Sequence, residues 1–351
     1  MSPNDLAPPT LAAPQSRLRP QSVAIVGATG AVGEALLQCL HQRHFPLSRL
    51  RLLASPRSAG KLLPFDDEQI PVEPLTADAF AGVDIALFSA GGARSRSFAP
   101  AAVAAGAIVV DNSSAFRMDP DVPLVVPEIN AGDIAGHRGI IANPNCAAII
   151  AGVPLWPLHQ INPIRRLVIT TYQSASGAGA AAMQELLDAT RGYLDGNEPA
   201  PRVMPHPYAF NLFSHNTEID PATGYNDEET KVIRELRKIF AAPDLRITAT
   251  CVRVPVLRAH SIAINVTFDR PMTPATARDI LATAPGLRVV DDAAHNHFPM
   301  PREASGQDAI LVGRLREDHS DPSGRSLAMF VAGDQLLKGA ALNAVQIAER
   351  L

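Results

Sequence analysis

A glycine turn set between an apolar strand and a helix with one apolar face constrains the fold most. Residues 21–27 (QSVAIVG) form a short apolar run that ends in glycine, and apolar positions recur at helical spacing from 31 to 41. Glycines at this spacing permit a tight turn and the close approach of a pyrophosphate to backbone N–H groups at a helix start. The alternative to a pyrophosphate-binding turn is a glycine turn that serves only to reverse the chain. The turn reads Gly27-Ala28-Thr29-Gly30-Ala31-Val32-Gly33.

The first part of the chain repeats this strand pattern. Continuous apolar runs follow at residues 50–54, 83–89 and 107–111, and alanine-rich, helix-compatible residues separate the last two. Strands that are apolar throughout are buried on both faces, as in a parallel sheet. We therefore expect an α/β chain whose part up to about residue 145 is a Rossmann-type, doubly wound nucleotide-binding domain.

The pattern changes after Cys146. A long apolar helix is expected at 147–159 and a strand at 167–173, and then come alternating strands of antiparallel character at 247–256 and 260–268. These features predict a second, α+β domain. Its further helices are expected at 178–194, 227–241 and 274–283.

A chain of 351 residues is long enough for two domains with separate cores. The periodic segment 333–351 is predicted to be a terminal helix that packs back against the first domain. The expected boundaries are therefore 21–145 plus 331–351 for the first domain and 146–330 for the second. The aperiodic segment 195–226 is long for a connection, and such loops often cover a site or an interface.

Composition excludes several classes of protein. The net charge is −4 and no basic stripe is present, which argues against a nucleic-acid partner. No uninterrupted apolar run is long enough for a membrane helix. Three scattered cysteines are no disulfide framework and fit a reducing cytoplasm. Residues 1–20, rich in Pro and Ala, lack the apolar core of a secretory signal and are expected to be a disordered tail.

The segment about twenty residues beyond the glycine turn bears on the cofactor. An NAD-binding fold places an acid there to bind the ribose 2′-hydroxyl. This chain instead has two hydroxyls and two cations, which suit a 2′-phosphate and favour NADP. The alternative is a solvated loop whose charge is incidental. The segment reads Ala54-Ser55-Pro56-Arg57-Ser58-Ala59-Gly60-Lys61.

Cys146 is the candidate nucleophile. It follows Asn143-Pro144-Asn145 and opens an apolar helix, and the positive end of a helix lowers the pKa of a thiol placed there. The amide of Asn145 can donate to a developing oxyanion, which suits attack on a carbonyl carbon. Most lone cysteines are small buried hydrophobes, and this is our interpretation of Cys39 and Cys251.

A thiolate nucleophile needs an acid/base, and His260 is the best-placed histidine. It begins a strand directly after the loop 257–259. A lone histidine is more often structural, so the pattern alone leaves both roles open. His206, His295 and His297 are not completed to a metal site by any cysteine or carboxylate spacing, and no metal is expected.

Taken in order, these motifs resemble the aspartate-semialdehyde dehydrogenase family, from about residue 21 to 351. The resemblance implies a second domain of the glyceraldehyde-phosphate-dehydrogenase kind, used for catalysis and dimerisation, and hence a homodimer. It also implies the reduction of aspartyl 4-phosphate by NADPH through a thioester. The matching segments are VAIVGATGAVG, LLASPRSAGK, FSAGG, DNSSAFRM, VPEIN, NPNC, TYQSASGAG, CVRVPV and KGAALNAVQIAE.

The same resemblance implies residue roles. Cys146 is the nucleophile, His260 the acid/base, and Gln173 orients the reacting groups. Substrate binding falls to Arg253 for the carboxylate, Glu228 for the ammonium, and Lys231 and Arg117, with Asn112, for phosphate; Asn145 completes this set. The residues matched to the cofactor site are Gly27, Thr29, Gly30, Ala31, Val32, Gly33, Ser55, Arg57, Ser58, Ser89, Gly91, Asn112, Ser176, Gly177 and Gln335.

Two positions depart from the family pattern. Gln335 stands where the family usually has Asn, and its side chain is longer. Ala259 replaces the common glycine before the histidine and restricts the backbone there. The related N-acetylglutamyl-phosphate reductase is an alternative, but its nucleophile segment typically reads Asn-Pro-Gly-Cys. A catalytically silent, nucleotide-binding homologue is the alternative from another class of protein.

Overall fold

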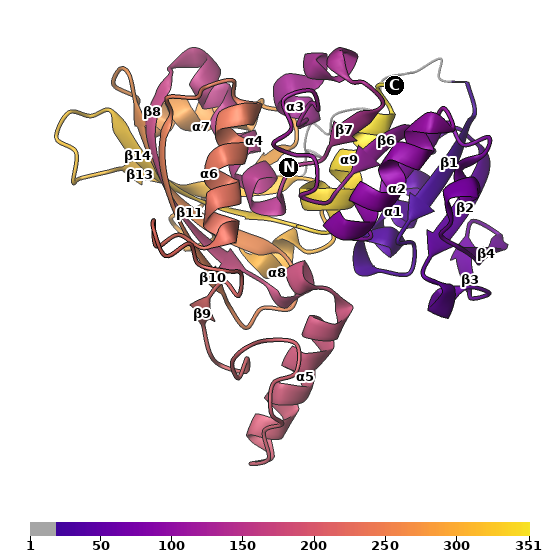
Figure 1. Cartoon of the computed structure of the whole chain (residues 1–351). Coiled ribbons are helices and arrows are strands. Elements are labelled where there is room, and N and C mark those ends of the chain that lie inside the picture. Colours follow the sequence, from indigo (N-terminus) through magenta and orange to yellow (C-terminus); the bar gives the residue numbers. More distant parts are fainter. Residues whose placement is uncertain (1–18) are drawn as a thin grey trace. The chain divides into compact units, whose positions relative to one another are not determined.

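The computed structural model describes residues 19–351, so all but the end of the tail predicted at 1–20 lies outside the described residues. The chain divides into two compact units. The first unit ends at Asn145 and resumes as Gly339–Leu351, and the second unit is Cys146–Lys338. The chain returns to the first unit at residue 339, compared with 331 in the sequence prediction. Figure 1 labels the elements of both units.

The first unit is built on a seven-stranded sheet in the order β3-β4-β2-β1-β5-β6-β7. All neighbouring strands are parallel except β3 and β4, which pair antiparallel. The predicted doubly wound sheet is therefore confirmed. The strands are β1 (Gln21–Val26), β2 (Leu47–Ala54), β3 (Leu62–Phe65), β4 (Glu68–Pro74), β5 (Ile85–Phe88), β6 (Ile108–Asp111) and β7 (Ile140–Ala142).

Among the residues that the structure describes, four α-helices belong to this unit, and the glycine turn leads into the first of them. A Cβ on Gly33 would lie 2.4 Å from the carbonyl oxygen of Gly27, so only glycine lets the helix pack this closely on the turn. The last helix packs against the first and against β6. The helices are α1 (Ala31–Gln42), α2 (Gly92–Ala104), α3 (Pro127–Asn130) and α9 (Leu342–Ala348).

The predicted terminal helix at 333–351 was too long. Residue 333 ends a strand, a π-helical turn follows at Leu337–Ala341, and α9 comes next. The physical reason is Asp334, whose carboxylate accepts hydrogen bonds from the backbone N–H groups of Leu336 (2.9 Å) and Leu337 (3.3 Å). A short acid that accepts from the amides after it starts a helix, so the helix cannot extend back through it.

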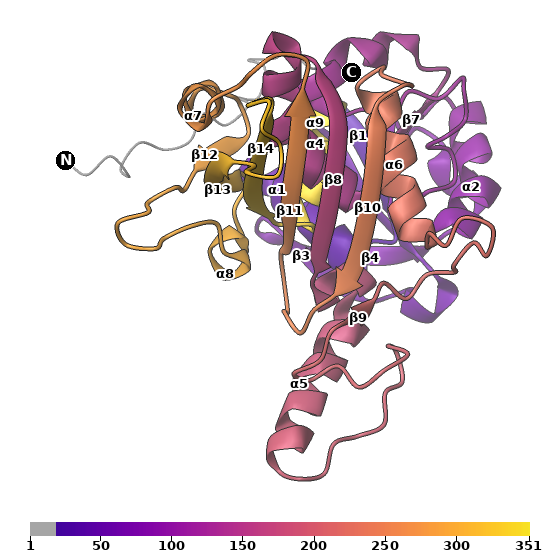
Figure 2. The same cartoon turned by 90° about the vertical axis from the view of Figure 1, so that its left-hand side faces the viewer.

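The second unit holds another seven-stranded sheet, in the order β12-β13-β14-β11-β8-β10-β9. Figure 2 shows β11, β8 and β10 side by side, with α5 extending beyond their ends. The strands are β8 (Ile164–Gln173), β9 (Phe213–Ser214), β10 (Arg246–Arg253), β11 (His260–Phe268), β12 (Leu287–Val289), β13 (Ile310–Glu317) and β14 (Ser326–Gly333).

Within Cys146–Lys338, five α-helices accompany this sheet. Helix α4 packs against β8, β11, β13 and β14, and α6 packs against β10. The four longest, α4, α5, α6 and α7, were all predicted to within two residues at each end, and α4 begins at Cys146 as expected. The helices are α4 (Cys146–Ile161), α5 (Ala180–Leu194), α6 (Asp227–Ile239), α7 (Pro274–Ala282) and α8 (Pro301–Ala304).

The predicted antiparallel character holds for β11 but not for β10. Strand β11 is antiparallel to both β14 and β8, whereas β10 is parallel to β8 and antiparallel only to the short β9. Strand β8 lies between β10 and β11, so the connection 254–259 crosses over its end. Alternation along a strand shows which side chains are buried and does not show which strand lies alongside.

Candidate active site

The ends of β8 and β10 and the start of β11 lie together at one edge of the second sheet, where the connection 254–259 crosses. Strand β8 ends at Gln173, which pairs directly with Arg253 at the end of β10. Strand β11 begins at His260, one residue before Ser261, which pairs with Tyr172. Residues paired across neighbouring strands lie side by side on one face. Gln173, Arg253 and His260 are all buried, with exposed fractions of 1%, 4% and 0%.

Helix α6 places an acid and a cation beside this edge. Gln173 accepts a hydrogen bond from Thr171 Oγ1 (3.2 Å) and donates through Nε2 to Glu228 Oε1 (3.1 Å). Lys231 Nζ lies 2.6 Å from Asp227 and 3.9 Å from Glu228. Glu228 is only 6% exposed, so its carboxylate is held close to the amide of Gln173 in a poorly solvated place.

A capping box fixes the start of α6. The side chain of Asn226 accepts from the backbone N–H of Glu229, and Glu229 Oε2 accepts from the backbone N–H of Asn226, both at 2.9 Å. The other oxygen of Glu229 accepts from the backbone N–H of Cys251 on β10 (2.9 Å). The capping box therefore ties the helix start to the strand, and with it the position of Glu228.

Arg253 is held by two hydrogen bonds. Its Nε donates to Asn216 Oδ1 (3.1 Å), and one terminal nitrogen donates to the backbone oxygen of Ser174 (3.2 Å). These bonds fix the plane of a guanidinium group, whose fork geometry matches a carboxylate.

His260 is completely buried and its ring is oriented by the end of β8. Nδ1 accepts a hydrogen bond from the backbone N–H of Ser174 at 3.1 Å. A backbone amide is only a donor, so it favours the neutral tautomer in which Nδ1 carries no proton and Nε2 is protonated. Among residues 19–351, Nε2 has no hydrogen-bond partner.

The charge state of His260 follows from its surroundings. The pKa of His260 is lowered to about 3, chiefly by burial and then by the neighbouring charge of Arg253, while Glu228 opposes the shift. The imidazole is therefore neutral near neutral pH. Gly177 packs against it, because a Cβ at that residue would lie 2.9 Å from His260 Cε1.

Cys146 begins α4, as the sequence predicted, and is partly exposed. Cys251 and Cys39 are buried, which confirms their interpretation as buried thiols. Burial raises the pKa of the Cys251 thiol to about 12, and the charge of Cys146 is among the smaller causes that also raise it. Cys146 thus belongs to the surroundings of β10, and Cys251 stays protonated and unreactive.

The segment 195–226 supplies more side chains to the site than its sequence predicted. Besides Asn216, it supplies Thr217, whose hydroxyl accepts from the backbone N–H of Glu228 (3.2 Å). It also supplies His215, which is buried; burial, followed by the charge of Arg253, lowers the pKa of His215 to about 4. The only signal in the sequence was the unusual length of this connection. Ser174, which was also missed, stands inside the TYQSASGAG segment.

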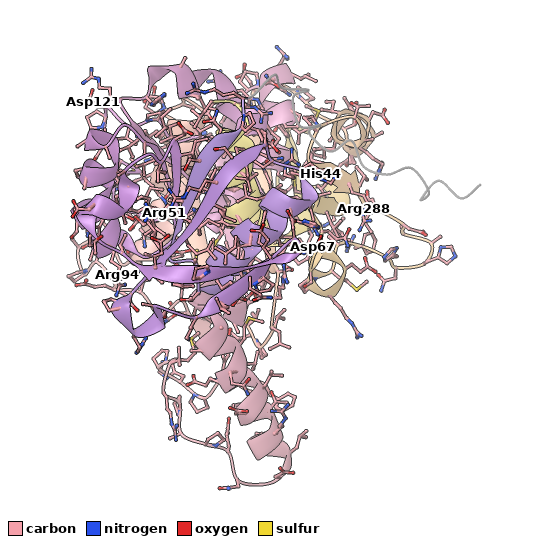
Figure 3. The ribbon with its side chains drawn as sticks, turned by 90° about the vertical axis from the view of Figure 1, so that its right-hand side faces the viewer. His44, Arg51, Asp67, Arg94, Asp121 and Arg288 are labelled. Atoms are coloured by element: carbon pink, nitrogen blue, oxygen red, sulfur yellow. The ribbon has the colours of Figure 1, made fainter. Side chains whose placement is uncertain are left out.

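The glycine turn borders a cavity of about 300 Å³ in the first unit. Arg57 and Ser58 both line it, and Thr29 Oγ1 is 3.5 Å from Ser58 Oγ. Arg94 of α2, labelled in Figure 3, was not predicted and adds a second guanidinium. None of the lining residues in the described part of the chain is an acid. The lining is Gly27, Thr29, Gly30, Ala54, Ser55, Arg57, Ser58, Leu75, Ser89, Ala90 and Arg94.

The other predicted cofactor residues lie apart from this lining. Ala31, Val32 and Gly33 form the first turn of α1, and Gly91 caps α2. Ser176, Gly177 and Gln335 belong to the second unit, where Gly177 packs against His260 and Gln335 donates a hydrogen bond to Ser176.

An amide network in the first unit holds the segment that precedes Cys146. Asn143 Nδ2 donates to Asn112 Oδ1 (2.9 Å), and Asn343 of α9 donates to Asn143 Oδ1 (2.6 Å). Arg117 donates to the backbone oxygens of Asn143 (2.9 Å) and Asn112 (2.7 Å). The network fixes the Asn143-Pro144-Asn145 turn, and Asn145 itself is buried.

These observations define a class of protein: an oxidoreductase with a dinucleotide-binding unit and a second unit that presents a cysteine, a neutral histidine and charges of both signs. The NAD-binding domain of semialdehyde dehydrogenases matches residues 22–137, and the dimerisation domain of the same family matches residues 155–338. The chain belongs to the aspartate-semialdehyde dehydrogenase family.

Individual relatives support this assignment. The chain is 57% identical to an aspartate-semialdehyde dehydrogenase of Synechocystis, over 95% of this chain and 97% of the relative. It is 44% identical to that of Bacillus subtilis, over 94% and 96%. The crystal structure of aspartate semialdehyde dehydrogenase II from Vibrio cholerae, complexed with ASA, superposes with a TM-score of 0.92 at 42% identity, over 95% and 98% of the two chains.

The comparisons also bear on partners. The match to a dimerisation domain agrees with the predicted homodimer. Within residues 19–351, no helix has the length and apolar character needed to cross a membrane.

Proposed function

We propose that this protein reduces L-4-aspartyl phosphate to L-aspartate 4-semialdehyde and phosphate with NADPH, in the synthesis of lysine and diaminopimelate, threonine and methionine. The observation that carries the proposal is the meeting of Gln173, Arg253 and His260 at one sheet edge, with Glu228 beside them. A small amino-acid acyl phosphate carries a carboxylate, an ammonium and a phosphate, so a site for it needs charges of both signs.

Each charged group has a role in binding. Arg253, fixed in plane by Asn216 and Ser174, clamps the substrate carboxylate. Glu228 binds the ammonium and is itself oriented by Gln173. Lys231 binds phosphate, and the same role is proposed for Arg117 of the first unit on the strength of its match to the family motif.

The covalent chemistry belongs to Cys146. Its thiolate attacks the acyl carbon, a C–S bond forms, and the C–O bond to the phosphate breaks, which leaves a thioester. NADPH, when bound, supplies the hydride that reduces this thioester. The resulting thiohemiacetal oxyanion collapses to the aldehyde, and the electron pair of the C–S bond returns to sulfur.

His260 acts on that oxyanion as a hydrogen-bond donor. Its ring is neutral with the proton on Nε2, so it stabilises the negative oxygen without complete proton transfer. This gives the predicted acid/base a more specific role in the reductive direction. The amide of Asn145, next in the chain to Cys146, is proposed as a second donor.

The cavity beside the glycine turn fits NADP better than NAD. Arg57 and Arg94 both line it, together with three serine hydroxyls and that of Thr29, and none of its lining residues within 19–351 is a carboxylate that could bind a bare ribose hydroxyl. We propose that the two guanidinium groups and Ser58 hold the 2′-phosphate. The glycines and the start of α1 hold the pyrophosphate.

The test uses the purified protein with aspartate semialdehyde, phosphate and NADP, and follows the absorbance of NADPH. Wild-type protein is expected to turn over, and Cys146→Ala is expected to have no activity above background. No turnover by the wild type refutes the enzyme proposal. Activity in Cys146→Ala refutes the nucleophile alone.

A further inference from the structure

Gln335 has both ends of its side-chain amide engaged within the second unit. It is 3% exposed and directly follows Asp334, beyond the end of β14. Its Oε1 accepts from the backbone N–H of Ala259 at 2.9 Å, and its Nε2 donates to Ser176 Oγ. The backbone N–H is only a donor, so it fixes which end of the amide faces Ala259 and which faces Ser176.

The orientation of the Gln335 amide determines the donor–acceptor direction of the hydrogen bonds that lead to His260. Ser176 Oγ lies 3.0 Å from Ser174 Oγ, and Ser174 Oγ lies 3.1 Å from His260 Nδ1. Because Ser176 accepts from Gln335, its single proton is available to donate to Ser174, and the proton of Ser174 is then available to donate to Nδ1. Both serines are buried, so water does not supply alternative partners.

The hydrogen bonds from Gln335 through Ser176 and Ser174 to His260 form a relay. Gln335 is also bonded to Ala259, so both departures from the family pattern lie at the start of this relay. Ala259 has a φ of +70°, in the left-handed region that disfavours an alanine by roughly 1 kcal/mol. Its N–H is held by Gln335, and Arg258 beside it is held by Asp334, at 2.7 Å from Nε to Oδ2. Asp334 and Gln335 therefore hold Arg258 and Ala259, the two residues before His260, by hydrogen bonds and stabilise the left-handed conformation of Ala259.

We propose that Gln335 is a positioning residue that fixes the proton of neutral His260 on Nε2, acting through Ser176 and Ser174. This role rests on the proposed function, because it matters only if His260 donates to the reacting oxygen. It differs from the cofactor contact that the family resemblance implies for Gln335, which would engage the amide with the nicotinamide nucleotide instead.

Gln335→Glu tests the direction of the relay at almost constant shape. A carboxylate only accepts, so Ser176 must turn its proton toward residue 335, and Ser174 loses its donor. We expect kcat to fall about tenfold, as for other residues that orient a catalytic group, while the KM for NADP changes less than twofold. Gln184→Glu, an exposed site on α5, makes the same chemical change and should leave both constants unaltered.

A double-mutant cycle separates a relay from independent effects. Ser174→Ala removes the last hydroxyl and keeps the backbone N–H, so Gln335→Glu added to it should lower kcat no further. Additive losses would refute the relay. Because a buried carboxylate can impair folding, Ser176→Ala serves as a second, uncharged break, and it should reproduce the loss in kcat.

The tautomer itself is measured by ¹⁵N NMR of ring-labelled histidine in the full-length protein. The wild type is expected to show a pyridine-like Nδ1 and a pyrrole-like Nε2 for His260, and Gln335→Glu and Ser176→Ala should show a mixture of tautomers. An unchanged tautomer together with weaker NADP binding would overturn the proposal in favour of a cofactor contact. This spectrum needs no turnover, so its outcome is distinguishable from failure of the proposed reaction.

Discussion

Gly177→Ala probes how closely the backbone approaches His260, the proposed hydrogen-bond donor, and Arg253, the proposed carboxylate clamp. Its Cβ would lie 2.9 Å from Cε1 and 3.1 Å from Nε2 of His260, and 3.1 Å from a terminal nitrogen of Arg253. Ordinary contacts between such atoms begin at about 3.5 Å. The histidine and the arginine must therefore each move by roughly half an ångström, and neither yields easily because both are hydrogen-bonded to Ser174.

The displacement sets the size of the effect. A misplacement of about 1 Å costs roughly 10²-fold in rate, so we expect kcat/KM to fall by about 10- to 100-fold. That fall corresponds to about 1.4 to 2.7 kcal/mol of transition-state stabilisation. Overpacking of a buried site costs typically 1–3 kcal/mol of folding stability, so about the same amount is expected from Tm or urea unfolding.

The measurement pairs steady-state kinetics with thermal unfolding. Gly132→Ala is the control, because its Cβ would meet no atom within 4 Å. Gly177 has no positive φ, so alanine strains no backbone there, and any loss is assigned to the side chains it touches. A folded Gly177→Ala protein with kcat/KM within twofold of the wild type would refute the geometry of the site.

Two further predictions concern the cofactor and pH. Arg94→Ala should weaken NADPH binding about tenfold, the value of a charge-assisted hydrogen bond, and leave NADH binding unchanged; Arg96→Ala is the exposed control, and equal losses for both cofactors would contradict the assignment. Below pH 6.5 the unfolded state binds more protons than the folded state, because burial lowers the pKa values of His260 and His215 to about 3 and about 4. Stability should therefore fall with acidification, by up to about 2.7 kcal/mol per pH unit near pH 5 from these two groups. In urea unfolding at a series of pH values, His260→Gln should reduce that slope by about half; an unaltered slope would show that His260 does not stay neutral.

The sequence predicted the first unit well because its signals are local. The glycine turn, its strand and its helix are contiguous, and the conformational demands on Gly27 and Gly33 can be recognised in eleven residues. Arg94 was missed because it lies on another helix, and only the fold of the sheet brings α2 alongside the turn.

The second unit was harder because its site depends on pairing between distant strands. Strands β8, β10 and β11 were predicted and β9, β12, β13 and β14 were not. The position of β8 between β10 and β11 is set by long-range contacts that leave no mark within 247–268. That arrangement is what brings Ser174 beside His260. The roles of Ser174 and Asn216 are therefore visible only in the folded structure.

The neutrality of His260 explains why its tautomer, rather than its charge, needs to be controlled. Burial is the largest cause of its lowered pKa, and the charge of Arg253 is secondary. When a substrate carboxylate offsets the charge of Arg253, the larger cause remains, so the ring stays neutral through the reaction. A neutral imidazole with Nδ1 protonated would present a lone pair to the oxyanion and repel it. The backbone N–H of Ser174 and the relay from Gln335 both donate to Nδ1, and together they keep the single ring proton on Nε2.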